Sequence, residues 1–176
     1  MNTVGPLTPV TTVTRAERLR ALANAVNLST AAGLLLATLS RTPVEPGPHG
    51  LILGTNYTPR LPLAGAFTVG NVIFYRADRA FIDSRPDLLD HEAGHATQYA
   101  WCLGLPFLPL YFSCAAWSWW RTGDPGSRNF FERNAGLALG GYRELPTIAR
   151  MPIIFNRLKR TSRPHRRSTP PKENRP

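Results

Sequence analysis

The residues best suited to chemistry lie in one short stretch, residues 88–98, which reads LLDHEAGHATQ. It contains the pattern H-E-x-x-H, formed by His91, Glu92 and His95. On a helix, residues four positions apart lie one turn above each other on the same face. Both imidazoles can therefore bind one metal ion, while Glu92 is placed to take a proton from a water molecule beside that ion. The pattern predicts a Zn²⁺ site with Glu92 as general base.

A catalytic zinc needs a third protein ligand, which must come from elsewhere in the chain. The candidates are His49, Asp124, Glu132, Glu144 and His165. His49 lies in a proline-rich loop, where an exposed histidine is more common than a metal ligand. His165 lies in the basic tail, which is expected to be disordered, and is set aside. Asp124 is explained by its Asp-Pro-Gly turn, and Glu144 is close to a proline that weakens any helix there.

Glu132 is the favoured third ligand. It lies on a predicted helix after the motif helix, and Ala135 and Gly136 are small enough to let the two helices approach closely. Two structural explanations stay open for the same residue. Glu132 can close a capping box with Asn129 as the N-cap, or form a helical ion pair with Arg128.

Four further residues are candidates for supporting roles. Gln98 lies on the ligand face of the motif helix, where it can orient a ligand histidine through a hydrogen bond. Hydrolysis also needs a donor for the developing oxyanion. Tyr111, Arg133 and Tyr142 are the candidates, and the sequence does not choose among them.

The motif needs a helix to hold it, and the sequence predicts one over residues 85–102. Ser84 is suited to be its N-cap, followed by a proline in the first turn. Gly104 and Pro106 are stop signals after it.

Two other helices are predicted around this one. The helix that carries Glu132 begins near Ser127 or Asn129 and is ended by the glycine pair at residues 140–141. Nearer the N-terminus, a capping box at residues 14–17 opens a helix that can run over residues 15–39.

The β-structure is predicted to be short. Residues 51–53 read as a strand, and residues 66–75 read either as one strand with a bulge at Gly70-Asn71 or as a hairpin with a turn there. We expect this segment to run alongside the motif helix, where it can pair with a peptide by strand addition. A core or edge strand without any ligand is the alternative.

The chain of 176 residues is predicted to hold a single domain. Residues 1–13 are Pro/Thr-rich and expected to be irregular, and residues 14–156 form the domain. Residues 157–176 are a Pro/Arg-rich tail expected to be disordered. Two uncharged runs inside the domain, residues 21–40 and 99–120, reach the length of a membrane span.

Membrane contact is favoured over full spanning. Polar residues interrupt the first run, and Gly104, Pro106 and Pro109 interrupt the second. Three tryptophans near the end of the second run resemble an interfacial belt, with a thick core wall as the alternative. No secretory signal is recognised, because the first 14 residues carry no charge.

Cys102 and Cys114 are expected to be buried free thiols, with a disulfide as the alternative.

The net charge of +10 belongs mainly to the tail. Residues 157–176 carry eight Lys or Arg against one acid, which is +7 of that total. Such a tail can attract anionic lipid at the cytoplasmic face, a partner that fits better than nucleic acid. A solvated tail without a dedicated partner is the common alternative.

The arrangement of His91-Glu92-x-x-His95 with Glu132-x-x-Ala135 on a later helix resembles the gluzincin class of zinc metallopeptidases. Together with the segment at residues 68–72 and the proline-rich apolar connector, it is similar to small, largely uncharacterised, membrane-associated bacterial proteins of this type. The resemblance covers residues 27–142. It implies zinc bound by His91, His95 and Glu132, with Glu92 as base. The chain departs from the class in its size, because it has no obvious second lobe for substrate.

The expected fold is therefore α+β and mainly helical, with a minimal zincin-like core. In it, a short strand or hairpin lies beside the motif helix, and a second helix carries the last ligand. The leading functional hypothesis is a membrane-associated zinc metallopeptidase acting on a peptide or protein substrate. The alternatives are a non-catalytic membrane-associated protein with a structural zinc, and a binder of anionic lipid or nucleic acid through its basic tail.

Overall fold

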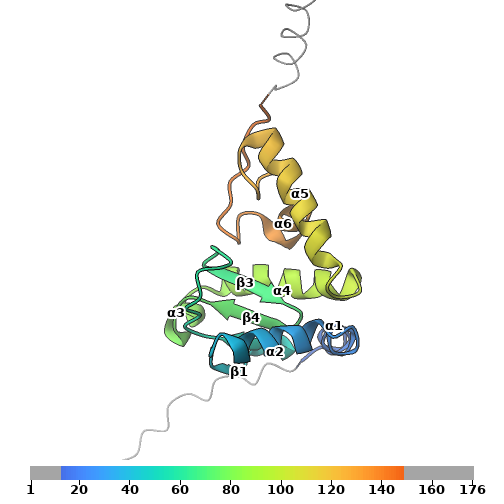
Figure 1. Cartoon of the computed structure of the whole chain (residues 1–176), viewed down its shortest axis with the longest axis vertical. Helices are drawn as coiled ribbons and strands as arrows, with labels where there is room; N and C mark the ends of the chain where they lie inside the picture. Colours follow the sequence, from blue (N-terminus) through green and yellow to red (C-terminus); the bar gives the residue numbers. More distant parts are fainter. Residues whose placement is uncertain (1–12, 149–176) are drawn as a thin grey trace, which may run out of the picture.

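A computed structural model describes residues 13–148, and the predictions for the N-terminal segment, the basic tail and His165 lie outside this range. The fold is α+β and mainly helical, as predicted, with helices around a small mixed sheet (Figure 1). The elements are α1 (Arg15–Val26), α2 (Ser29–Leu39), β1 (Val44–Pro46), the 3-10 turn η1 (Pro48–Gly50), β2 (Ile52–Gly54), β3 (Ala66–Val69), β4 (Val72–Tyr75), α3 (Arg79–Asp83), α4 (Pro86–Trp101), α5 (Phe107–Thr122) and α6 (Phe130–Gly136).

The first helical region is broken, so the prediction of one helix over residues 15–39 is wrong. Its start is correct, since the capping box at residues 14–17 is formed. The chain then bends by 71° between α1 and α2. Asn27 explains the break, because its side-chain oxygen accepts hydrogen bonds from the N–H and the hydroxyl of Ser29 (3.0 and 2.7 Å). The bend allows α1 to pack on α4 while α2 covers the sheet.

The sheet has the strand order β1-β2-β4-β3, with β2 and β4 parallel and the other two pairs antiparallel. Residues 66–75 are a hairpin, so the turn at Gly70-Asn71 is the correct alternative. Gly70 is required there, because its φ is +63° and an added Cβ would lie 2.4 Å from the main chain of Ser29. This leaves β3 as an edge strand.

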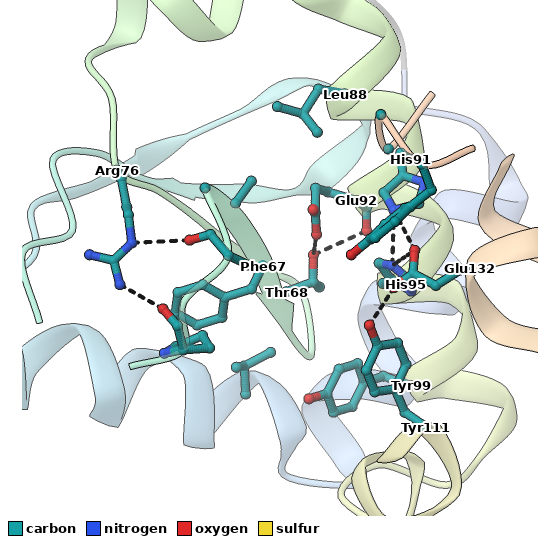
Figure 2. A pocket seen from close by; sticks show the side chains of 18 of the residues that line it. Phe67, Thr68, Arg76, Leu88, His91, Glu92, His95, Tyr99, Tyr111 and Glu132 are labelled. Carbon is teal, nitrogen blue, oxygen red and sulfur yellow. Dashed lines mark hydrogen bonds and ion pairs between the residues drawn. The ribbon is translucent and has the colours of Figure 1, made fainter. Parts of the chain in front are cut away.

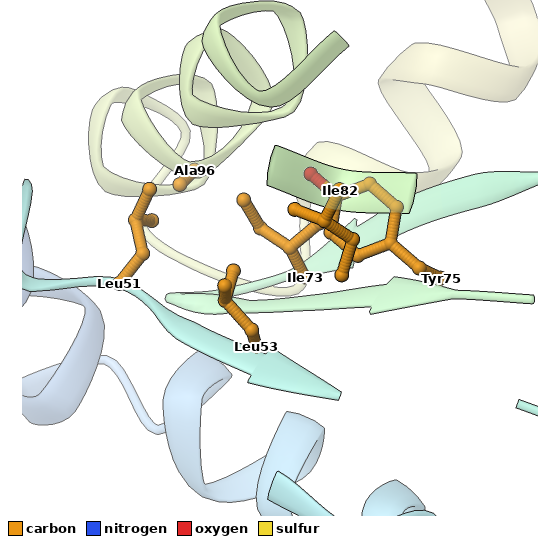
Figure 3. Close-up of a cluster of buried hydrophobic side chains, with 6 residues drawn as sticks. All are labelled: Leu51, Leu53, Ile73, Tyr75, Ile82 and Ala96. Carbon is orange, nitrogen blue, oxygen red and sulfur yellow. The ribbon is translucent and has the colours of Figure 1, made fainter. Parts of the chain in front are cut away.

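The core is divided by the sheet. Side chains on one face pack against α4, in a cluster that Figure 3 shows as Leu51, Leu53, Ile73, Tyr75, Ile82 and Ala96. On the opposite face, Val72 and Phe74 pack with Ala37 of α2. The alternation of side chains along the fully buried β4 therefore fixes α4 on one face and α2 on the other.

The motif helix α4 ends at Trp101, close to the predicted end, but Ser84 is not its N-cap. Ser84 instead ends the short helix α3, which the sequence did not reveal, and its hydroxyl donates to the carbonyl of Phe81 (2.7 Å). Asp78 is the N-cap of α3. The helix α4 follows at once and has no side-chain cap.

The apolar run 99–120 is divided between the end of α4, a turn and α5. Within residues 13–148, no single helix is long and apolar enough to cross a membrane, and only the bent pair of α1 and α2 passes that test on length and composition. Cys102 and Cys114 are free thiols, as expected, but each is only partly buried. The helix α6 begins after Asn129 as predicted and ends at Gly136, whose φ of +95° stops it before the glycine pair.

Candidate metal centre

The structure brings His91, His95 and Glu132 together at the α4–α6 interface (Figure 2). The Nε2 atom of His91 lies 3.2 Å from Nε2 of His95 and 3.1 Å from Oε2 of Glu132. The third side of this triangle, from His95 Nε2 to Glu132 Oε2, is 3.7 Å. All three residues are buried. The two motif histidines and the favoured glutamate thus form one group that can hold a metal ion.

The Nδ1 atom of each imidazole lies within hydrogen-bond distance of an acceptor oxygen. Nδ1 of His91 lies 3.1 Å from the carbonyl oxygen of Gly136, and Nδ1 of His95 lies 2.9 Å from Oε1 of Gln98. The orientation of the Gln98 amide is fixed, because its nitrogen donates to the carbonyl of Phe131 (2.9 Å). Each Nδ1 therefore carries the proton in the neutral imidazole, and each Nε2 presents a lone pair to the other.

This arrangement fits a metal ion. Two Nε2 lone pairs and a carboxylate oxygen of Glu132 converge, and Oε2 of Glu132 is buried without a hydrogen-bond donor. Such a group is unfavourable unless a proton or a metal ion lies between its members. Tetrahedral bonds of the length that zinc makes to nitrogen and oxygen would separate ligand atoms by about 3.3 Å, and the observed spacing is close to that.

The electrostatics of the group also favour a cation. Burial alone would lower the pKa of His95, but its contacts with Glu132 and the charge of Glu92 raise it. Burial alone would raise the pKa of Glu132, yet the neighbouring imidazoles of His91 and His95 lower it to about 2. Glu132 is therefore an anion, and the field that it creates attracts positive charge.

Tyr111 orients Glu132. Its hydroxyl donates to Oε1, which leaves Oε2 directed at the two histidines. Burial, reinforced by the charge of Glu132, raises the pKa of Tyr111, so the phenol keeps its proton. In this structure the Tyr111 hydroxyl is therefore engaged with Glu132 and holds that carboxylate in place.

The two structural explanations for Glu132 are wrong. Asn129 caps α6 alone, by accepting from the N–H of Phe131 (3.0 Å), and no capping box is formed. Arg128 pairs with Glu144 (3.2 Å). Glu132 has no part in either interaction and faces the histidines instead.

The other candidate ligands are engaged elsewhere. His49 contacts Glu17 of α1, with 2.6 Å between Nδ1 and a carboxylate oxygen. Asp124 accepts from the N–H groups of its own turn. Glu144 is bound by Arg128 and by Arg133, and the latter contact (3.1 Å) also turns Arg133 away from the site.

Two glycines let the ligands meet. Gly94 lies against α6, where an added Cβ would be 3.0 Å from Cβ of Ala135, so the predicted close approach of small residues is correct. An added Cβ on Gly140 would be 2.5 Å from the imidazole ring of His91. The sequence suggested Gly140 only as a helix stop, but its main chain packs against the imidazole ring of His91.

Glu92 lies beside the group and is held by the hairpin. The hydroxyl of Thr68, on β3, donates to Oε2 of Glu92 (2.7 Å). Among the described residues nothing donates to the other oxygen. Burial raises the pKa of Glu92, against the opposite effect of His95. The sequence placed a strand beside the motif helix but gave no sign that Thr68 would hold the carboxylate.

A cavity of about 890 Å³ connects these groups. It is lined by His91, Glu92, His95 and Glu132, by residues 66–69 of β3, and by a largely apolar remainder. Tyr142 also lines it, and burial followed by the charges of Glu132 and Glu92 raises the pKa of Tyr142 to about 12. Tyr142 is thus a protonated phenol in the cavity, whereas Arg133 does not line it.

The edge strand β3 offers main-chain groups to this cavity. In its two-residue hairpin, Val69 and Phe67 form the hydrogen-bonded pairs with β4, and the main chain after β4 donates to the carbonyl of Gly65 (3.0 Å). The N–H and C=O groups of the intervening residues, Ala66 and Thr68, therefore point to the open edge.

No protein-family model, curated protein or solved structure matches this chain. The geometry alone therefore carries the functional argument.

Proposed function

We propose that the protein is a zinc-dependent metallopeptidase, with His91, His95 and Glu132 as the zinc ligands. The observation that carries this proposal is the convergence of two imidazole Nε2 atoms and one carboxylate oxygen in a buried group. Two imidazoles and one carboxylate are a ligand set of hydrolytic zinc sites, whereas magnesium and calcium prefer oxygen ligands.

The neighbouring side chains are suited to hydrolysis. Bound zinc would act as a Lewis acid and lower the pKa of water in its open position. Glu92 accepts the proton of the attacking water through the oxygen that Thr68 leaves free. Tyr142 is the remaining donor for the oxyanion, because Tyr111 is bound to Glu132 and Arg133 to Glu144.

The edge strand supports a peptide as the substrate. An extended peptide can pair with the open main-chain groups of Ala66 and Thr68, which places it along the cavity wall. Thr68 then has two contacts. Its main chain pairs with the substrate, and its side-chain hydroxyl donates to Glu92. The same residue would set the distance between the peptide and the base.

A structural zinc is the second candidate function, favoured by the burial of the group. His91 and Glu132 are only 2% and 1% exposed, and such a site can tie α4 to α6 without catalysis. The two functions differ in what Glu92 does. A structural site needs no proton acceptor beside it.

The test is the variant Glu92→Gln, with Glu144→Gln as a surface control. Zinc content and cleavage of a quenched fluorescent peptide library are measured for both variants and the wild type. We expect Glu92→Gln to keep its zinc and lose cleavage, with Glu144→Gln unchanged in both. Cleavage that persists in Glu92→Gln would exclude Glu92 as the base. Zinc without cleavage in the wild type would support the structural site.

A further inference from the structure

Two turns that are far apart in the sequence lie side by side at one corner of the molecule (Figure 1). They are the turn between α1 and α2 and the turn between α4 and α5. An added Cβ on Gly104 would be 2.9 Å from Asn27, and the Asn27 amide lies within 3.5 Å of the carbonyl of Tyr99. The side chains that these turns expose form what we term the apolar corner: Val26, Leu28, Trp101, Leu103 and Leu105.

The exposure of these apolar side chains to water is energetically unfavourable. Leu28 and Leu103 are 67% and 78% exposed, and Val26 and Trp101 are exposed to a similar degree. Leu28 and Leu103 also have φ values of +65° and +58°. This left-handed region is unfavourable for a branched side chain and normally taken by Gly or Asn. Neither the folded core nor the local backbone benefits from leucine at these positions.

The chain around the corner carries no charge. Residues 21–40 and 99–120, which meet here, contain no Asp, Glu, Lys or Arg. Further exposed apolar side chains follow on α5, at Leu110, Phe112 and Trp117, all at least half exposed. They are followed by Arg121, whose guanidinium lies over the rings of Trp117 and Trp120 (5.6 and 5.7 Å).

This distribution matches a lipid bilayer. Uncharged aliphatic side chains suit the hydrocarbon boundary, whereas tryptophan and arginine side chains suit the headgroup level. A protein partner would instead be expected to meet a polar rim around the corner. Neither of the two runs supplies a charged residue to such a rim.

We propose that the apolar corner inserts into the surface of a lipid bilayer, with Leu28 and Leu103 as its deepest side chains. The protein then lies on the membrane through two adjacent turns. Phe112, exposed on α5, also lines the cavity together with Leu36 and Leu108. An exposed apolar side chain of α5 therefore also borders the cavity.

Vesicle binding of the full chain tests this proposal independently of the metal site. The probe is a phosphatidylcholine vesicle in high salt, which screens attraction through the basic tail. The key variant is Leu28→Asn/Leu103→Asn. Asn tolerates the left-handed region, so this variant should fold at least as well as the wild type. We expect its partitioning into vesicles to fall by at least about tenfold, since two aliphatic side chains no longer transfer from water.

The control is Leu63→Asn, which removes a still more exposed leucine (86%) from a loop outside the corner. It should bind vesicles like the wild type. Equal binding by Leu28→Asn/Leu103→Asn and the wild type would overturn the proposal, as would no binding by the wild type. A wild-type dimer that the double variant converts to monomer, without vesicle binding, would assign the corner to a second copy of the chain. Zinc content and peptide cleavage do not enter any of these outcomes.

Discussion

The metal centre and the apolar corner are both helix junctions that involve α4, but they are built in opposite ways. At the candidate metal centre, glycines leave room for α6 and the following turn to reach the histidines, and Nδ1 of each histidine has a hydrogen-bond acceptor. At the corner, leucines occupy backbone conformations that suit glycine or asparagine, and their side chains point into water. The first junction is complementary within the chain except where Oε2 of Glu132 meets the two Nε2 atoms, a point that a bound cation would complete. The second junction is covered only if something outside the chain packs on it.

This contrast predicts that substitutions at the metal centre weaken the protein and its zinc binding, whereas substitutions at the corner leave the fold intact or improve it.

The largest effect is expected for Gly140→Ala. Its methyl group would overlap the His91 ring, so the ring or the turn must move, and zinc affinity should fall on the order of a hundredfold. Titration against a competing chelator measures this. Gly65→Ala is the control, because nothing lies within 4 Å of its added Cβ; equal affinities for both variants would contradict the packing of Gly140 on a ligand.

Gln98→Leu should have the next largest effect. It keeps the volume of the side chain but removes the acceptor for His95 and the donor to Phe131. We expect zinc affinity to fall about 10- to 100-fold and the free energy of unfolding of the metal-free protein to fall by about 1–3 kcal/mol. The control is Thr97→Val, because the Thr97 hydroxyl donates to the carbonyl of Ala93 within its own helix. This variant should change the zinc affinity and the free energy of unfolding only slightly. Chemical denaturation with and without zinc separates the two effects.

Tyr111→Phe and Tyr142→Phe form a smaller, paired test. Loss of the Tyr111 hydroxyl frees Oε1 of Glu132, and zinc affinity should fall about tenfold. Tyr142→Phe should leave zinc affinity unchanged and slow peptide cleavage, because that hydroxyl is assigned to the oxyanion. If the two variants exchange these effects, the roles of the two tyrosines are reversed.

The smallest expected effect has the opposite sign. Leu103→Asn relieves an unfavourable backbone conformation, and we expect the free energy of unfolding in the absence of lipid to rise by up to about 1 kcal/mol. Thermal unfolding measures this as a small increase in Tm. A clear decrease would mean that Leu103 contributes to packing within the chain, which would remove the contrast between the two junctions.

The sequence predicted those parts of the fold that depend on local signals. The capping box at residues 14–17, the N-cap Asn129 and the end of α4 follow from turn and capping chemistry that a short window contains. The bend after Asn27 was missed because it depends on a side-chain hydrogen bond and on packing of α1 against α4. The helix α3 was missed because its five residues are too few for a hydrophobic period to be visible.

The candidate site divides in the same way. The spacing of His91 and His95 is local and could be read directly, and the choice of Glu132 rested on small neighbours that do pack closely. The contacts of Thr68 with Glu92, and of Gly140 with His91, join segments that only the tertiary fold brings together. No pattern in a single sequence specifies such contacts, which is also why Tyr111 and Tyr142 could not be told apart in advance.

The most direct test of the central claim is the zinc content of purified wild-type protein and of His91→Ala, Glu132→Ala and Glu144→Ala. The account predicts close to one zinc per chain in the wild type and in Glu144→Ala, with zinc lost from the other two variants. Full retention of zinc in Glu132→Ala, or a wild-type protein that binds no zinc when it is supplied, would contradict it.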